Sequence, residues 1–454
     1  MITPDKIQRG KYWHFPKPKT DMSTSYLQEE PISQEKFYCE YHPMGHAIFD
    51  HSWYKDIPIV NKMGVIEGYH MVNRIALPIQ QMALEIIVPH LLGNHTELRD
   101  NTNGENKANV LAWYREFWDE KNLDTARYRL VYDSMAVGDA AILFYKDGNT
   151  LKWKLLSYLQ GKDESYRRSD KYGELSEFAR FYSMPGDNGK DILYCDIIDS
   201  TFYNTYASGA KDWELIESTQ HGFRTIPVVY HRRRDGAYHT SVQGNIDETE
   251  KSISRLSEDN RTKAKSRYNL KTKNPNNIQT VNMGLSDLII TETDGDLKLI
   301  PGADISTQFK YEYEMQMETI YNKLGIVFVK SKSSGDMPVG SMKLLFYPTE
   351  RVCRNLKEEY NETIDKINTI FKQGLMMEYP ERAFELKNFK VNASIKTFTP
   401  QDDQSYNAMI GQLKSYGVLS TQTASENTTI SANDEFKRIK DETFEENSLR
   451  PTIV

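Results

Sequence analysis

A short stretch near the N-terminus holds the residue types from which metal sites are built. It carries one cysteine, three histidines and one aspartate: Cys39, His42, His46, Asp50 and His51. On a helix, His42 and His46 would share one face at the i, i+4 spacing, and neutral histidines are common zinc ligands. Pro43 and Gly45 disfavour that helix, and no second pair of ligands follows nearby. We therefore expect scattered surface histidines, with neither a metal nor another cofactor.

Two acidic pairs, Glu358-Glu359 and Asp402-Asp403, could in principle hold magnesium for a nuclease. The first is predicted on a helix face and the second at a helix start, where solvated carboxylates are common. Gly186-Asp-Asn-Gly-Lys190 has the wrong spacing for a nucleotide-binding loop. Neither Gly-x-Ser-x-Gly nor His-Glu-x-x-His occurs. We expect no enzyme; a metal-dependent nuclease and a monomeric adaptor or scaffold protein are the alternatives.

Basic residues gather towards the end of a helix predicted to begin at Asn245. Asn245 would be its N-cap, with Glu248 three residues on, close to a capping box. The basic positions follow without an acidic residue after Asp259: Arg261, Lys263, Lys265, Arg267, Lys271 and Lys273. This run is a candidate contact for DNA or a partner protein, although helix-dipole compensation on a solvated face explains most of it. A second group, Arg232-Arg233-Arg234, could bind phosphate, but a solvated turn or a salt-bridge cluster between subunits is the favoured interpretation.

The longest regular pattern in the sequence runs from Asp304 to Met376. Apolar residues recur at helical spacing until Gly325 ends a first helix. Loop-forming residues follow, among them Lys330, Ser331, Lys332, Ser333 and Ser334. Helical periodicity resumes at Ser341 and continues for about 35 residues, or roughly 50 Å. Pro348 lies within this second pattern, and because proline removes a backbone donor we expect a kink there.

The composition is that of a folded protein with much polar surface. Of 454 residues, 27% are charged, and the formal net charge is −7, which argues against a protein that coats nucleic acid generally. The three cysteines lie too far apart for a disulfide framework and indicate a reducing compartment. The N-terminus predicts no signal peptide. The best membrane candidate, Ile75–Leu92, contains amide and acidic side chains and prolines, so we expect no membrane span.

Helices followed by a meander of short strands predict an α+β fold. After an irregular arm over 1–60, helices are expected over 64–92, 110–118 and 123–137. A hairpin should form from 140–145 and 151–156 around Lys146-Asp-Gly-Asn149. Further short strands are expected at 178–183, 192–198, 213–222, 225–230, 288–291, 297–300 and, as one or two strands, 384–398. Two C-terminal helices should follow, one starting near Asp403 and one capped by Ser420.

A helix ending in glycine, a Lys/Ser/Gly loop and a long proline-containing helix, in this order, resemble the centre of the portal proteins of tailed bacteriophages. The residues that carry the resemblance are Ile320-Tyr-Asn-Lys-Leu-Gly325, Ser333-Ser-Gly335, Leu344-Leu-Phe-Tyr-Pro348 and, in the wing, Gly138-Asp-Ala-Ala141. The resemblance implies an N-terminal arm and wing (1–243), a stem helix (244–266), a small α/β clip (267–303), a second stem helix (304–324), a tunnel loop (325–340), the long kinked helix with return strands of the wing (341–400), and a helical crown or tail (401–454).

The same resemblance implies a function without a catalytic site. About 12 subunits would close head-to-tail into a ring-shaped channel at one capsid vertex. Double-stranded DNA would be packaged and ejected through it, with Lys330 and Lys332 forming a thin, sequence-independent basic ring in the bore. Terminase, a head-tail adaptor, the major capsid protein and a scaffold protein would be partners, and the clip would present a docking surface. The protein would assemble in the bacterial cytoplasm and end in the virion.

Overall fold

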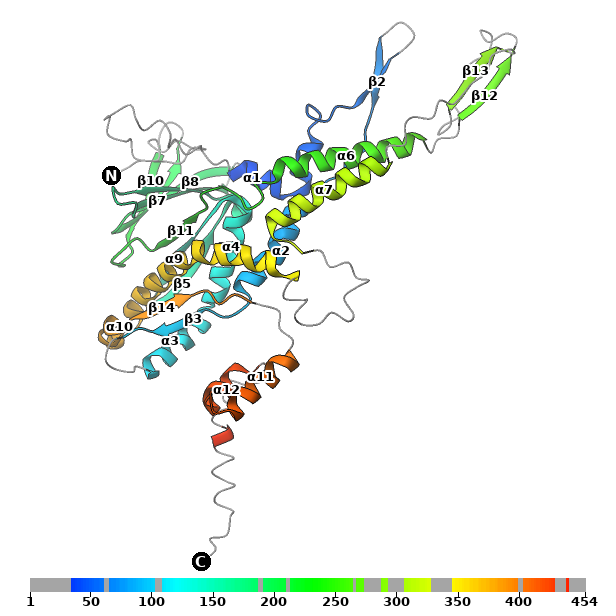
Figure 1. Cartoon of the computed structure of the whole chain (residues 1–454). Helices are drawn as coiled ribbons and strands as arrows, with labels where there is room; N and C mark the ends of the chain where they lie inside the picture. The colour runs from blue at the N-terminus through cyan, green and yellow to red at the C-terminus, as the bar shows by residue number, and fades with distance from the viewer. Residues whose placement is uncertain are drawn as a thin grey trace, which may run out of the picture. The chain divides into compact units, whose positions relative to one another are not determined.

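The computed structural model describes residues 34–60, 65–102, 108–186, 191–209, 213–263, 267–272, 287–292, 306–327, 345–398, 403–428 and 438–440. The chain divides into two compact units, Met1–Phe328 with Pro348–Phe398, and Val329–Tyr347 with Thr399–Val454. The larger unit combines helices with mainly antiparallel sheets (Figure 1), so the predicted α+β class is confirmed.

The core of the larger unit is formed by helices packed on a three-stranded sheet. The helices are α2 (Ile79–Leu92), α3 (Ala108–Glu120), α4 (Leu123–Val137) and α9 (Tyr347–Glu378), and the sheet has the order β11 (Val228–Arg232), β4 (Asp139–Asp147), β5 (Thr150–Leu156). The long helix α9 buries its predicted apolar stripe, including Leu356, Ile364 and Phe371. Burying a side chain of this size stabilises by about 1.5–3 kcal/mol, so α9 is anchored along much of its length.

A second, five-stranded sheet is a meander. Its strands run in chain order: β6 (Glu164–Ser169), β7 (Leu175–Pro185), β8 (Asp191–Ile198), β9 (Phe202–Ser208) and β10 (Trp213–Gln220), each antiparallel to the next. One face buries Phe181 and Cys195, which pair across β7 and β8. On the same sheet, buried Arg180 joins Asp163 and Asp196 at 3.0 and 3.5 Å. The strands expected within 178–222 are thus confirmed, and β6 and β9 are additional.

Several local predictions are confirmed. α4 ends at Val137, where Gly138 adopts φ +92° and its N–H bonds to the carbonyl of Ser134 at 2.9 Å. β4 and β5 form the expected hairpin, with Asp147 paired to Thr150 across a two-residue turn. Glycine supplies the positive φ that such turns require.

The helix expected over 64–92 is wrong in its first half. Residues Ile66–His70 form β2, which pairs antiparallel with β1 (Ile57–Val60), and only Ile79–Leu92 is helical. Pro78 stands directly before α2, and a proline there ends any helix arriving from the N-terminal side. The arm also contains regular structure: α1 (Gln34–Tyr41) and the 3-10 turns η3 (Pro43–Gly45) and η4 (Ala47–Phe49).

The first expected stem helix differs from the prediction at both ends. α6 spans Gln243–Lys263, so Asn245 lies inside the helix and is not its N-cap. The turn before it already provides a carbonyl, that of Val242, which accepts from the N–H of Asn245 at 3.0 Å. After α6 the basic run forms a strand, β12 (Arg267–Thr272), paired in parallel with β13 (Asp287–Glu292). Tyr268 and Leu270 alternate with polar residues there, which is the period of a strand.

The strand expected at 288–291 is confirmed by β13, and residues 297–300 lie outside the described part of the chain. After α9 and the 3-10 turn η6 (Pro380–Arg382), helix α10 (Ala383–Asn388) takes the place of one expected strand. Only β14 (Val391–Ser394) returns, pairing with β3 (Glu97–Asp100). In the smaller unit, α11 (Asp403–Ser415) and α12 (Thr421–Asn427) confirm the C-terminal helices, and the Ser420 hydroxyl caps α12 by accepting from Thr423 N–H at 3.1 Å.

Candidate functional site

Helices α6 and α7 (Ser306–Leu324) lie side by side and share a small apolar core (Figure 1). Ile246 of α6 packs with Ile320 and Leu324 of α7. The hydroxyl of Thr249 donates a hydrogen bond to Gln316 Oε1 at 2.7 Å. The two helices expected to form a stem therefore pack directly on each other.

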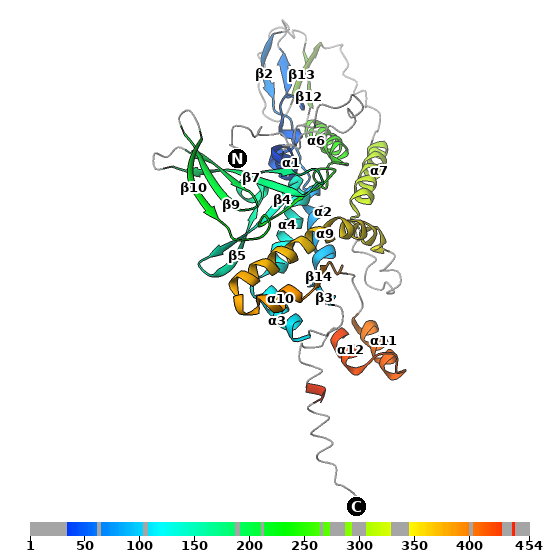
Figure 2. The same cartoon turned by 90° about the vertical axis from the view of Figure 1, so that its left-hand side faces the viewer.

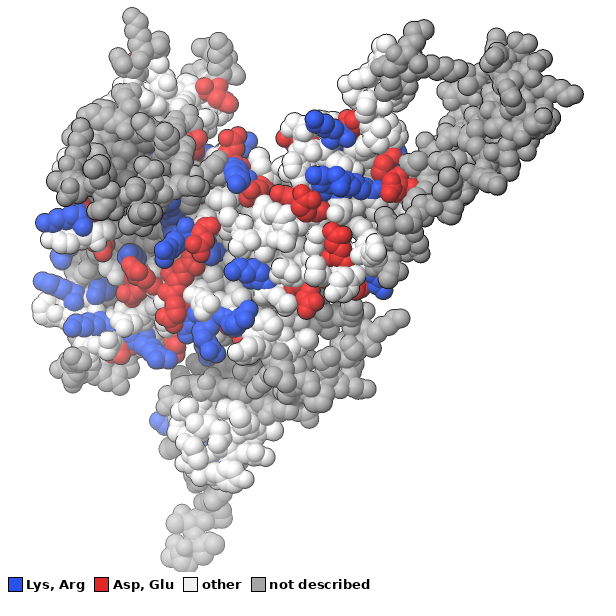
Figure 3. Space-filling view, turned by 45° about the horizontal axis from the view of Figure 1, so that its top comes forward, with Lys and Arg blue, Asp and Glu red and all other residues white. Residues whose placement is uncertain are grey.

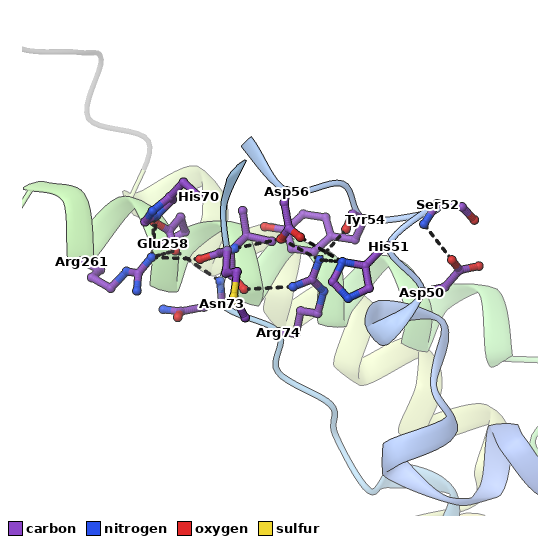
Figure 4. Close-up of polar contacts among 12 residues, drawn as sticks. Asp50, His51, Ser52, Tyr54, Asp56, His70, Asn73, Arg74, Glu258 and Arg261 are labelled. Atoms are coloured by element: carbon purple, nitrogen blue, oxygen red, sulfur yellow. Dashed lines mark hydrogen bonds and ion pairs between the residues drawn. The ribbon is translucent and has the colours of Figure 1, made fainter. Parts of the chain in front are cut away.

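An extended segment following β2 lies along α6 and is bound to it through its backbone (Figure 4). Three alternate amides donate to side chains one turn apart on α6: Asn73 N–H to Glu258 Oε2 (3.2 Å), Ile75 N–H to Ser254 Oγ (2.9 Å) and Leu77 N–H to Glu250 Oε1 (2.7 Å). Two residues of extended chain advance about 6.6 Å, and four residues of helix about 6 Å. Because the two periods nearly match, the segment and the helix stay in register over two turns.

Glu258 is the most heavily used acceptor in this ladder (Figure 4). Its carboxylate lies 2.8 Å from His70 Nε2 and 3.0 Å from the Arg261 guanidinium, besides accepting from Asn73 N–H. Arg261 also donates to the carbonyl of Met71 at 3.2 Å. Burial raises the pKa of Glu258, but the hydrogen bonds from His70, Arg261 and Asn73 outweigh it and lower the pKa to about 2. The ionised carboxylate thus fastens the end of β2 to α6.

A second polar group joins the start of β1 to the same extended segment (Figure 4). Arg74 forms an ion pair with Asp56 at 2.9 Å and donates to the carbonyl of Tyr54 at 3.0 Å. Asp56 also accepts from Val72 N–H at 3.2 Å and lies 2.9 Å from His51 Nδ1. The two strands of the hairpin are therefore cross-linked at their base, and the base is bound to α6.

Beyond this base lies the β1–β2 hairpin, whose second strand β2 is labelled in Figures 1 and 2. It exposes large apolar side chains. They are between 50 and 70% exposed: Ile57, Ile59, Ile66, Tyr69 and Met71. A two-stranded hairpin is marginally stable alone, and clustered exposed apolar side chains mark interaction surfaces. Among the residues that the structure describes, the hairpin pairs with no third strand, so its edges are open to another chain. This arrangement suits protein contact rather than catalysis.

Helices α7 and α9 meet at a tight corner. Gly325 has φ +66°, and a Cβ there would lie 2.8 Å from a methyl of Val352, so a larger residue is strained twice. The Thr349 hydroxyl donates to the carbonyl of Gly325 at 2.6 Å. α9 begins at Tyr347, which places Pro348 in its first turn, where a missing backbone donor has little effect. Because residues 328–344 lie outside the described chain, the kink remains a prediction.

The structure places some of the predicted site residues and not others. Seven lie outside the described residues: Lys265, Lys273, Lys330, Ser331, Lys332, Ser333 and Ser334. Lys263 ends α6, while Arg267 and Lys271 lie on β12. Arg261 is half-exposed on α6, where it binds Glu258 below the hairpin. Arg261 is thus engaged within its own chain, and the contact of the whole basic run with DNA or a partner stays a prediction.

The histidine-rich stretch does not converge on one point. His46 Nδ1 lies 2.7 Å from Glu250 of α6, with both side chains fully buried, whereas His51 pairs with Asp56. Within the described chain, one group has the proximity of a metal site: His95, Asp119 and Asp124. The Asp124 carboxylate already accepts from Thr96 and Trp118 and pairs with Arg127, which gives it a structural role.

One member of the acidic pair on α9, Glu359, meets one member of the arginine triplet, Arg233. Glu359 lies 3.5 Å from His231 Nε2 and 3.3 Å from Arg233 Nε. Burial lowers the pKa of His231, so Arg233 supplies the positive charge that pairs with Glu359. Arg233 is therefore held by a salt bridge within its own chain, and a salt-bridge cluster between subunits stays a prediction. Glu358, the other member of the pair, is exposed.

On the face shown in Figure 3, acidic and basic side chains are intermixed over the described surface. Such a surface carries no extended field of one sign, in keeping with the net charge of −7. No helix in the described part of the chain has both the length and the apolar character needed to cross a membrane.

Comparison with protein families matches residues 45–449 to the family described as phage portal protein, SPP1 Gp6-like. The matched range contains the hairpin, α6, α7, α9 and both C-terminal helices. No curated protein matches the chain.

Proposed function

The chain belongs to the SPP1 Gp6-like family of phage portal proteins, and we propose that about 12 copies of it close into a ring at one vertex of the capsid. Double-stranded DNA passes through this ring during packaging and ejection. The protein acts by shape and charge rather than by catalysis, needs no cofactor, and leaves nucleotide hydrolysis to a separate motor. It assembles in the bacterial cytoplasm and becomes part of the virion. The family match over residues 45–449 is the observation that carries this proposal.

The described geometry supports different roles for successive parts of α6. The helix packs on α7, holds the hairpin through Glu258, and is followed by the β12–β13 pair. Among the described residues the β12–β13 pair has no third strand, and two-stranded sheets with open edges are ready partners for other chains. We assign this pair to the clip, residues 267–303, on which terminase and the head-tail adaptor would dock. The major capsid protein and a scaffold protein contact the outer part of the ring.

The loop after α7 is proposed to line the channel, with Lys330 and Lys332 as its basic groups. Every phosphate that a lysine neutralises tightens binding by counterion release, so a thin ring guides DNA where a fully basic bore would retain it. Replacing both lysines by alanine should leave rings intact but change DNA packaging or retention. The control replaces two exposed lysines, Lys154 of β5 and Lys171 of the β6–β7 turn. Unchanged packaging with the loop variant would refute this role.

Pro348 is proposed to redirect the chain between this loop and α9. Pro348→Ala removes the steric block to a helix that continues from residues before Tyr347. We expect the variant to lose ring assembly while its monomer keeps a normal thermal unfolding temperature. Normal rings formed by Pro348→Ala would count against a proline-dependent path.

The experiment that tests the proposed function is the particle mass in solution together with negative-stain images of the purified protein. Rings with a central channel support the portal role. A monomer without nuclease activity would fit an adaptor or scaffold, and a magnesium-dependent nuclease would fit the enzyme alternative. Either of the last two results overturns the proposal.

A further inference from the structure

One face of α7 carries acidic groups that have no partner among the described residues. Glu314 and Glu318 are exposed one turn apart, beside Tyr311 and Met315, which are 71% and 52% exposed. Neither glutamate forms a hydrogen bond or ion pair with any described residue. Carboxylates spaced i, i+4 destabilise a helix by about 0.2–0.5 kcal/mol. This face is therefore both charged and apolar, and no charge of the described part of the chain compensates it.

The first turns of α9 carry the opposite charge. Arg351 and Arg354 are exposed, and Lys357 follows one turn further along. None of the three forms an ion pair with a described residue. Arginine is suited to such a role because its planar group pairs with a carboxylate in a fixed geometry.

The charges that border the two glutamates on α7 and the two arginines on α9 are also of opposite sign. On α7 Lys310 lies one turn before Glu314, and on α9 Glu358 lies one turn after Arg354. Neither flanking residue forms an ion pair with a described residue. Each face thus carries a group of one sign bordered by a charge of the other sign, and complementary potentials of this kind set the register of an interface.

The two faces do not pair within one chain. α7 and α9 are joined at the corner where Thr349 binds the carbonyl of Gly325, and from there they run in different directions (Figures 1 and 2). A ring closed head-to-tail needs two different, complementary surfaces on every copy. We propose that the α7 face with Glu314 and Glu318 of one copy docks on the α9 face with Arg351 and Arg354 of the next, an inference that rests on the proposed ring.

Charge reversal tests this contact. Glu314→Lys with Glu318→Lys, and separately Arg351→Glu with Arg354→Glu, place like charges at every joint, and we expect the ring fraction to fall by about tenfold or more in each case. Combining all four changes in one chain restores opposite charges with the polarity exchanged and should recover the rings. The measurement is mass photometry at one protein concentration and salt, with negative-stain images.

A matched control separates site from net charge. Glu381→Lys with Glu385→Lys changes the charge equally on exposed residues of η6 and α10 and should leave rings unchanged. Thermal unfolding of each variant checks its fold. The neutral variants Glu314→Gln with Glu318→Gln provide a milder perturbation, with a smaller loss of rings expected.

The outcomes are distinguishable. Rings that survive both reversals refute the contact while leaving the portal role standing. Loss in both reversals without recovery in the combined variant means that the two faces do not meet, which also refutes it. Rings that survive the arginine reversal but retain less DNA assign Arg351 and Arg354 to DNA instead. A wild-type chain that stays monomeric refutes the proposed ring itself, and with it this inference.

Discussion

Replacing Glu258 with alanine is expected to free the hairpin from α6 while the core stays folded. The carboxylate holds three donors at once, His70, Arg261 and Asn73 N–H. Hydrogen bonds to a charged group contribute about 1.5–3 kcal/mol each. Because these three share one carboxylate, their contributions are not additive. We therefore expect a total loss of about 2–4 kcal/mol, confined to the extended segment.

Amide hydrogen exchange measures this loss directly, because the Asn73 amide is itself bound to Glu258. A local destabilisation of about 2–4 kcal/mol corresponds to exchange roughly 30- to 800-fold faster. Asp259→Ala is the matched control, since Asp259 is the exposed neighbour of Glu258. Amides of β4, such as that of Ile142, should keep their rates in both variants. Unchanged exchange at Asn73 in Glu258→Ala, or equal acceleration in Asp259→Ala, would refute the reasoning.

Three further outcomes follow from the described contacts. Gly325→Ala should lower stability by about 1–3 kcal/mol through its clash with the α9 corner, more than Gly173→Ala, which has a positive φ but open space around it, as thermal unfolding will measure. Because the pKa of Glu258 is lowered from 4.5 to about 2 in the folded chain, its carboxylate stabilises the hairpin fully above pH 4.5, and this stabilisation is lost as the pH falls towards about 2. Cleavage of the hairpin by an acid protease should therefore increase across this pH window in the wild-type chain but not in Glu258→Gln. Asp196→Ala should cost about 3–5 kcal/mol, read as a lower unfolding temperature, because it strips buried Arg180 of one of its two carboxylates.

The elements that could be predicted from the sequence are those determined by local chemistry. α4 ends at a glycine that takes up positive φ, the β4–β5 hairpin turns at a glycine, and Ser420 caps the helix that follows it. In each case one residue type satisfies a backbone requirement that no distant contact overrides. The paired packing of α6 and α7 was implied by the family resemblance, and the apolar stripe of α7 supplies part of the contact.

The β1–β2 hairpin could not be predicted in the same way. Met71, Ile75 and Ile79 happen to follow helical spacing, and the period alone favoured a helix through them. What decides the extended conformation is a tertiary ladder, in which side chains of α6 accept the amides that a helix would have used internally. Gly68 and Pro78 were the local signals against the helix.

The candidate site was only partly accessible from the sequence for a related reason. The basic run was visible as composition, but its division into the end of α6 and β12 depends on pairing with β13, a strand far along the chain. In the sequence Arg261 looked like an unpaired cation. In the structure it contacts Glu258, one turn earlier on α6, and His70, which lies on β2. Opposite charges on α7 and α9 acquire meaning only when a second copy is considered.

The hairpin and the α7 face both combine charged side chains, which fix position, with exposed apolar side chains, which can be buried by a partner. At the hairpin, Glu258 and Asp56 fix the position of its base, while Ile57 and Tyr69 remain exposed. Charged contacts set register more than they add affinity, and apolar burial supplies the affinity when a partner arrives. In a closed ring each copy is held on both sides, so leaving requires two joints to open together. A contact that is weak between two isolated copies is therefore sufficient to hold a closed ring. Because a substitution changes this contact between every pair of neighbours, it should disassemble the whole ring.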